Sequence, residues 1–223
     1  MAPFRNTVSA LAVVAIGSVN AAFGPAFSTG PTSNNSFIRE ASSTLLLPKA
    51  PSRSSGDLSL WVGMGTSNGD LIQSIADNYD SSDWSIFAYT LMSTSATTQT
   101  PVEGKNSTAY ANDAVTMHYK YNDTTGNYTQ TVLVNGKVVS TLSTSDGKAE
   151  GWGSAVECAE TNCGTLGAHS WTNTTIILDV ADPDYIDTMG KGDGVTGDMS
   201  TSDGGKTWKV STIHIPEYTF ESS

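Results

Sequence analysis

The chain has few basic residues and very few histidines. Its 223 residues include 11 Lys and Arg against 22 Asp and Glu, for a formal net charge of −11, and only three His. Nucleic acid and anionic membrane surfaces are bound by clustered Lys and Arg, so this balance excludes both as partners. The sequence also lacks a His-Glu-x-x-His pair and a Gly-x-Ser-x-Gly elbow, which argues against a zinc protease and a serine hydrolase.

Cysteine is scarce as well. The only two cysteines, Cys158 and Cys163, lie close together, and in an oxidising compartment they are expected to form one local disulfide. No other ligands stand at a spacing suited to zinc. The acidic loop from Gly190 to Gly205 matches no recognised calcium-binding pattern, and such segments are usually solvated turns. We therefore expect no metal and no cofactor.

Long apolar runs are absent except near the N-terminus. There, Arg5 precedes the apolar run Val8 to Ile16, and small residues follow up to Ala21. The run is too short to span a bilayer and is typical of a secretory signal peptide. We predict a signal peptide over residues 1–21 and a secreted, extracellular protein.

Glycosylation sequons agree with export. Asn-x-Ser/Thr triplets mark surface positions of secreted eukaryotic proteins, where glycans can be attached. Five are present, and the predicted glycosylation sites are Asn34, Asn106, Asn122, Asn127 and Asn173.

The rest of the chain divides into two parts. Residues 22–56 are rich in Ser, Pro, Gly, Asn and Ala with little periodicity, which predicts a flexible segment or a pro-segment. Residues 57–218 read as short strands, with alternating apolar positions from Asp113 to Tyr121 and an Asn135-Gly136 turn between two β-branched runs. No helical stripe is present, so we predict one all-β domain, an antiparallel sandwich.

A glutamine in an apolar strand is the first candidate for chemistry. The runs Leu60 to Met64 and Leu71 to Gln73 flank a Gly-Thr-Ser-Asn-Gly loop, which predicts two strands joined by a turn. A primary amide such as that of Gln73 is costly to bury without hydrogen-bond partners. It is therefore either satisfied by neighbouring backbone or used in a site.

Carboxylates are the second candidates. Glu150 precedes Gly151-Trp152-Gly153, and Glu157 precedes Cys158, so both stand beside apolar residues that would raise a carboxyl pKa. Two such acids could hydrolyse a glycoside, but Glu150 and Glu157 fall on opposite faces of a regular strand. Glu103 is interpreted as a surface acid.

The order of these motifs resembles the fungal glutamic peptidases, the eqolisins. The resemblance rests on Trp61-Val62-Gly63, Leu71-Ile72-Gln73, Trp84, Tyr89, the Asn135-Gly136 hairpin, Lys148 to Trp152 and, loosely, Gly167 to Leu178. It implies a concanavalin A-like sandwich (jelly roll) of two antiparallel sheets that cleaves proteins in acid. In that family a glutamate deprotonates the attacking water and a glutamine amide donates to the developing oxyanion.

Carried over residue by residue, the resemblance assigns the oxyanion role to Gln73. The family pattern has Ala-Glu directly followed by Trp, with a second glutamate three residues on. Here Glu150 is separated from Trp152 by one extra residue, and the next glutamate is Glu157. That insertion flips the strand face beyond it unless a bulge absorbs it, so either glutamate is a candidate base and a non-catalytic member is the alternative. The candidate substrate contacts are Trp61, Trp84, Tyr89 and Trp152.

Two functions remain open at this stage. One is a secreted, acid-acting endopeptidase that uses Gln73 with Glu150 or Glu157. The other is a non-catalytic, lectin-like carbohydrate-binding module or secreted effector. The partner is accordingly a polypeptide or a glycan, and the protein is expected to be a monomer. Convergence of Gln73 with one glutamate within reach of a shared water is what the endopeptidase requires.

Overall fold

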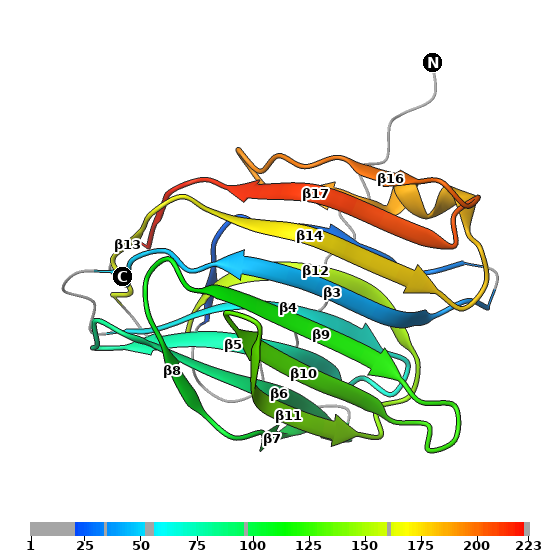
Figure 1. Ribbon diagram of the computed structural model, residues 1–223, viewed down its shortest axis with the longest axis horizontal. Coiled ribbons are helices and arrows are strands. Elements are labelled where there is room, and N and C mark those ends of the chain that lie inside the picture. The colour runs from blue at the N-terminus through cyan, green and yellow to red at the C-terminus, as the bar shows by residue number, and fades with distance from the viewer. Residues whose placement is uncertain (1–20, 34, 52–55, 96–97, 160–161, 221–223) are drawn as a thin grey trace.

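The computed structural model describes residues 21–33, 35–51, 56–95, 98–159 and 162–220. Strands stack in two layers, and every strand pair is antiparallel (Figure 1). In spatial order, the first sheet consists of β11 (Lys137–Thr144), β10 (Tyr128–Val134), β9 (Ala114–Tyr121), β3 (Ile38–Leu46), β14 (His169–Leu178), β17 (Thr207–Ile215) and β16 (Met199–Thr201).

The second sheet lies behind the first in Figure 1. Its main strands, in spatial order, are β12 (Ala149–Cys158), β4 (Asp57–Thr66), β5 (Leu71–Tyr79), β6 (Trp84–Ser95) and β7 (Thr98–Glu103). The two sheets join where Ala149 of β12 pairs with Ile38 of β3. The short elements are β1 (Ala22–Phe23), β2 (Phe27–Thr29), β8 (Ser107–Ala109), β15 (Gly190–Lys191), the pair β13 (Thr165–Leu166) and β18 (Tyr218–Thr219), and the 3₁₀ helix η1 (Pro183–Thr188).

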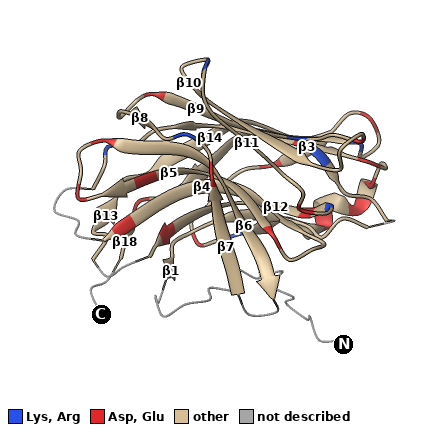
Figure 2. Cartoon of the chain, turned by 90° about the horizontal axis from the view of Figure 1, so that it is seen from below, with Lys and Arg blue, Asp and Glu red and all other residues tan. Residues whose placement is uncertain are grey.

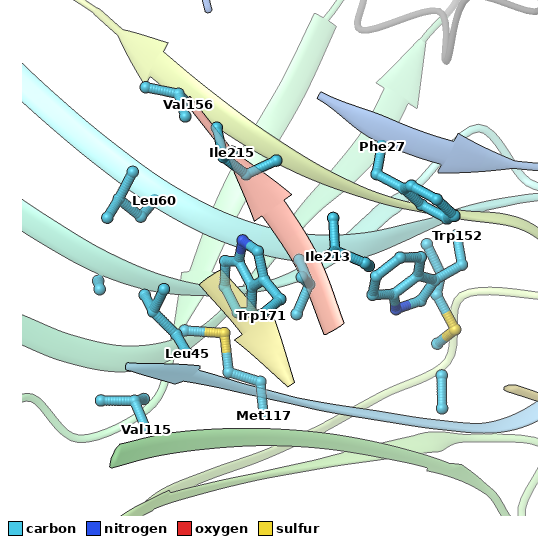
Figure 3. Close-up of a cluster of buried hydrophobic side chains, with 14 of the residues drawn as sticks. Phe27, Leu45, Leu60, Val115, Met117, Trp152, Val156, Trp171, Ile213 and Ile215 are labelled. Atoms are coloured by element: carbon cyan, nitrogen blue, oxygen red, sulfur yellow. The ribbon is translucent and has the colours of Figure 1, made fainter. Parts of the chain in front are cut away.

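The main core fills the space between the sheets. Alternate residues of each strand point inward, as the twofold side-chain period of a strand requires. Figure 3 shows part of this core, where Trp171 of the first sheet lies near Leu45 and Met117 and Trp152 of the second sheet lies beside Phe27. The predicted all-β, jelly-roll sandwich is therefore confirmed.

The hairpin expected around Asn135-Gly136 is present as β10 and β11. Asn135 has φ 50° and Gly136 has φ 78°, so both central residues occupy the left-handed region that a type I′ turn requires. The strand–turn–strand unit that leads to Gln73 is likewise present as β4 and β5.

The described residues within 22–56 form strands and not the flexible segment that the composition suggested, and the pro-segment alternative stays a prediction. They supply β1, β2 and β3, and β3 lies inside the first sheet between β9 and β14. Its small polar residues find partners within the sandwich: the Ser43 hydroxyl hydrogen-bonds the Thr174 hydroxyl over 2.7 Å, and both residues are buried. Low hydrophobicity therefore did not prevent burial, because the neighbouring strands satisfy the hydroxyl groups.

The predicted disulfide between Cys158 and Cys163 is present. Asn34 and the predicted signal peptide up to residue 20 lie outside the described residues. Asn106, Asn122 and Asn173 are exposed, and glycan attachment at them stays a prediction. The 3₁₀ helix η1 is the longest helix in the described part of the chain, and no helix there has the length and apolarity to cross a membrane.

Candidate functional site

A second, smaller apolar cluster lies on the outer face of the second sheet, away from the main core. We call it the outer-face patch. It consists of Trp61, Leu71, Ile75 and Ala155, with the partly buried Phe87, Tyr89 and Leu91 packed against them. These side chains come from β12, β4, β5 and β6, at positions that alternate with those pointing into the main core.

Gln73 lies within this patch. Strand register places it in one row with Gly63 of β4 on one side and with Tyr89 of β6 on the other. Gln73 is 4% exposed, and its Oε1 has no hydrogen-bond partner among the described residues. Buried polar atoms of this kind are rare in folded proteins, so the amide is a candidate ligand contact.

Glu150 lies outside the patch. The pairing of β12 with β4 shifts register between Ala149 and Gly151, so Glu150 occupies a β-bulge, and its side chain is exposed. The bulge absorbs the extra residue and returns Trp152 to the core.

Glu157 lies on the same outer face as Gln73, but at a distant position along the strands. Glu157 pairs with Ser59, and Ser59 pairs with Asp77, which is four residues beyond Gln73 on β5. Four residues along a strand and two strand spacings correspond to about 16 Å between the Cα atoms of Gln73 and Glu157. Both side chains would have to extend fully toward each other to share one water, and Oε2 of Glu157 already accepts from the Trp61 indole.

Glu157 instead belongs to an acidic end of the patch, which we define as Asp57, Asp77 and Glu157. Burial raises the pKa of Glu157, although the Trp61 indole Nε1 donates to its Oε2 over 2.8 Å and favours the charged form. Burial, with the nearby Asp57 carboxyl, raises the pKa of Asp77 to about 7, while the Ser59 hydroxyl donates to Asp77 over 2.7 Å.

Acidic residues (red) outnumber basic ones (blue) across the described strands and loops (Figure 2). Within the described ranges, no group of three or more His, Cys, Asp or Glu is arranged to hold a metal ion. In the acidic end of the patch, the raised pKa values of Asp77 and Glu157 favour protonated carboxyl groups.

The aromatic candidates divide between the two faces of the sheet. Trp61 and Tyr89 belong to the outer-face patch, as a ligand contact requires. Trp84 and Trp152 are 1% and 0% exposed in the main core, and the Trp84 indole donates to the Pro48 carbonyl. Both point toward the other sheet, so the expectation that they contact a ligand is corrected.

Glu103 is exposed, as its interpretation as a surface acid predicts, but its place beside Tyr89 was not predicted. It pairs with Tyr89, so Gln73, Tyr89 and Glu103 form one row across β5, β6 and β7. Burial and then the negative charge of Glu103 raise the pKa of Tyr89 to about 12. Two strand spacings place Gln73 and Glu103 about 10 Å apart at their Cα atoms. No local signal in the sequence indicates this, because the row depends on register across three strands.

The residues around Trp152 explain why β12, beyond its bulge, carries no carboxylate closer to Gln73 than Glu157. The family pattern places glutamates directly before this Trp and three residues after it. Counted from Trp152, these positions are Gly151 and Ala155. Ala155 lies beside Trp61 in the outer-face patch, two strands and two residues away from Gln73, or about 12 Å between Cα atoms.

Comparison with solved structures identifies the fold. A scytalidoglutamic peptidase solved with a peptide-based transition-state analogue matches with a TM-score of 0.55 and 16% identity, over 87% of this chain and 99% of that one. SCP-B, an eqolisin solved with the tripeptide Ala-Ile-His, matches with a TM-score of 0.52 and 17% identity over the same shares. No protein-family model and no curated protein sequence matches the chain. The chain therefore has the fold of the eqolisin peptidases.

Proposed function

We propose that the protein is a secreted polypeptide-binding β-sandwich that recognises an extended chain on the outer face of β12, β4, β5 and β6. The observation that carries this proposal is Gln73, whose Oε1 is buried without a hydrogen-bond partner within the outer-face patch. A primary amide offers two N–H donors and an acceptor oxygen, which match the C=O and N–H groups of a peptide unit. Leaving such a group unpaired is costly, so a ligand that pairs with it gains binding free energy.

The surroundings of Gln73 suit a polypeptide better than a glycan. The patch is aliphatic and aromatic, and the rings of Phe87 and Tyr89 meet edge to face with centroids 6.0 Å apart. Sites that take apolar side chains are lined in this way, with a few polar groups that fix orientation. The peptide-based analogue and the tripeptide in the two peptidases of the same fold also support a polypeptide ligand.

Two features of the glutamates favour binding over cleavage. Glu150 is exposed at a bulge, and Glu157 lies about 16 Å from Gln73 by strand register, with its Oε2 held by the Trp61 indole. A general base must reach the attacking water while the amide reaches the carbonyl oxygen.

A second candidate function is acid-acting endopeptidase activity with Glu103 as the base. One observation favours it: Glu103 shares the row of Gln73 and Tyr89, and both Gln and Glu side chains are long. Export is part of either proposal, supported by the signal-like N-terminus, the sequons and the disulfide.

The test measures binding and cleavage together. Fluorescein-labelled, denatured casein is titrated with the wild type, with Gln73→Ala and with Gln99→Ala, and anisotropy reports binding at pH 5. Gln99 lies on β7 and is the matched control. We expect saturable binding by the wild type and by Gln99→Ala, and about tenfold weaker binding by Gln73→Ala, the effect of one lost hydrogen bond.

The same proteins are then incubated with casein near pH 3 in the presence of pepstatin. No release of acid-soluble fluorescence is expected for a binding protein. Release that disappears in Glu103→Gln supports the endopeptidase instead. Absence of both binding and cleavage would overturn both proposals.

A further inference from the structure

A buried glutamine of the opposite sheet contacts the strands that carry the candidate site. Gln130 on β10 is 0% exposed, and its side chain crosses the core to β5 and β6. Its Nε2 donates over 2.8 Å both to the Tyr89 carbonyl and to the Thr90 hydroxyl. Its Oε1 accepts from the Ser74 hydroxyl over 3.0 Å and from the Tyr89 N–H over 3.4 Å. Both donors and both acceptor positions of this amide are therefore engaged.

These contacts are made directly beneath Gln73. Ser74 follows Gln73 on β5, and Tyr89 is the residue opposite Gln73 on β6. A second side chain from the first sheet, Tyr119 of β9, also hydrogen-bonds the backbone next to Gln73. The Tyr119 hydroxyl accepts from the Ser74 N–H over 2.8 Å and donates to the Val62 carbonyl of β4. The backbone on both sides of Gln73 is thus held from inside the sandwich.

The hydrogen bonds from Gln130 continue toward a buried acid. The Thr90 hydroxyl lies 3.1 Å from the Thr144 hydroxyl, and Thr144 donates to Oδ2 of Asp146 over 2.7 Å. Asp146 is fully buried. The donors can therefore run in one direction, from Ser74 through Gln130, Thr90 and Thr144 to Asp146, whose pKa burial raises to about 6. Gln130 is fully engaged in this network, whereas Oδ1 of Asp146 has no partner among the described residues. Buried polar networks hold a core in one arrangement.

We infer that Gln130 is a positioning residue for the outer face, which holds Gln73 and Tyr89 in the arrangement that binds a polypeptide. This inference rests on the proposed function. An apolar side chain of similar length would fill the same space without the cost of burying an amide. The four hydrogen bonds of Gln130 are all made to β5 and β6 beside Gln73. This placement indicates that the amide holds these two strands in position.

The test uses Gln130→Met and a matched control, Thr174→Val. Methionine keeps the length of glutamine but makes none of its hydrogen bonds, whereas Thr174→Val removes a buried hydroxyl pair with Ser43, on β14 and β3, away from Gln73. Affinity for labelled, denatured casein is measured well below the melting temperature of each variant. We expect about tenfold weaker binding by Gln130→Met and unchanged affinity for Thr174→Val. Equal affinity of Gln130→Met and wild type would overturn the inference.

Gln130→Glu separates positioning from a general loss of stability. A protonated carboxyl group retains one donor for Tyr89 and one acceptor for Ser74, whereas the ionised form has no donor. The affinity of Gln130→Glu is therefore expected to approach that of the wild type at low pH and to fall as pH rises. A constant ratio of the two affinities across pH would contradict the role of the donor.

If the wild type binds no casein, the proposed function fails. Hydrogen exchange still tests the role of Gln130 in that case. The readout is the exchange rate of the Ser74 and Tyr89 amides, relative to the amides of β14. Faster exchange in Gln130→Met but not in Thr174→Val supports the role of Gln130 in holding β5 and β6 in place. Unchanged exchange at both amides overturns it.

Discussion

Raising the pH is expected to destabilise this protein through Asp77. Burial and the neighbouring Asp57 raise the pKa of Asp77 to about 7 from a usual 3.8. The folded state therefore holds a proton that the unfolded state releases between these pH values. The stabilising contribution of the raised pKa is complete below about pH 4 and is lost as pH rises through 7.

The size of the effect follows from the shift. A difference of about 3 pKa units corresponds to at most about 4 kcal/mol of unfolding free energy between pH 4 and pH 8. Asp77→Asn is neutral at every pH, and its amide oxygen can still accept from the Ser59 hydroxyl that binds Asp77 in the wild type. We therefore expect the free energy of unfolding to fall with pH in the wild type and to fall less in Asp77→Asn, which still contains Asp146 with its pKa raised to about 6.

Urea unfolding followed by tryptophan fluorescence at a series of pH values measures this. Asp187→Asn is the control, because Asp187 is exposed on η1. The control should reproduce the slope of the wild type. An equal slope in Asp77→Asn, or wild-type stability that rises from pH 4 to pH 8, would refute the reasoning.

Three further predictions concern other parts of the sandwich. Burial lowers the pKa of His169 to about 4, so its contribution to stability is complete above pH 6.5 and is lost as pH falls toward 4; His169→Gln should remove this loss in the same urea series. Replacing both Cys158 and Cys163 by Ser should lower the free energy of unfolding by about 2 kcal/mol, the entropy of a short closed loop, and calorimetry of the pair of proteins checks it. Ala155→Glu places a carboxylate on β12 about 12 Å from Gln73 between Cα atoms, which is closer than Glu157. We expect this variant, unlike the parent, to release acid-soluble fluorescence from casein near pH 3, and the double variant Ala155→Glu/Gln73→Ala should not.

The elements that the sequence predicted are those encoded locally. The Asn135-Gly136 turn needs only two residues with positive φ between β-branched runs, and the strands around Gln73 need only apolar residues on both sides of a Gly-rich loop. The disulfide needed only two cysteines five residues apart in an oxidising compartment. Each of these predictions depends on a few neighbouring residues.

The predictions that failed required knowledge of which strands lie side by side. β3 reads as disordered because its serines have partners only in the assembled sandwich, where Ser43 bonds Thr174. Trp84 and Trp152 could be assigned to the core only once it was known which residues of each strand point inward. The place of Glu103 beside Tyr89 depends on β7, an edge strand that contains Pro101 and has little apolar pattern of its own.

The bulge at Glu150 connects the fold to the state of the candidate site. Without it, the residue inserted before Trp152 would turn this large side chain out of the core, at a cost of several kcal/mol. The bulge keeps Trp152 buried. Because side chains alternate along a strand, the burial of Trp152 determines which residues of β12 face outward, namely Gly151, Gly153, Ala155 and Glu157. Packing of the core therefore decides the outward register, whereas nothing in the core requires a carboxylate at Ala155. The fold therefore leaves the outward residues of β12 free to vary, which is why the fold alone does not determine the activity.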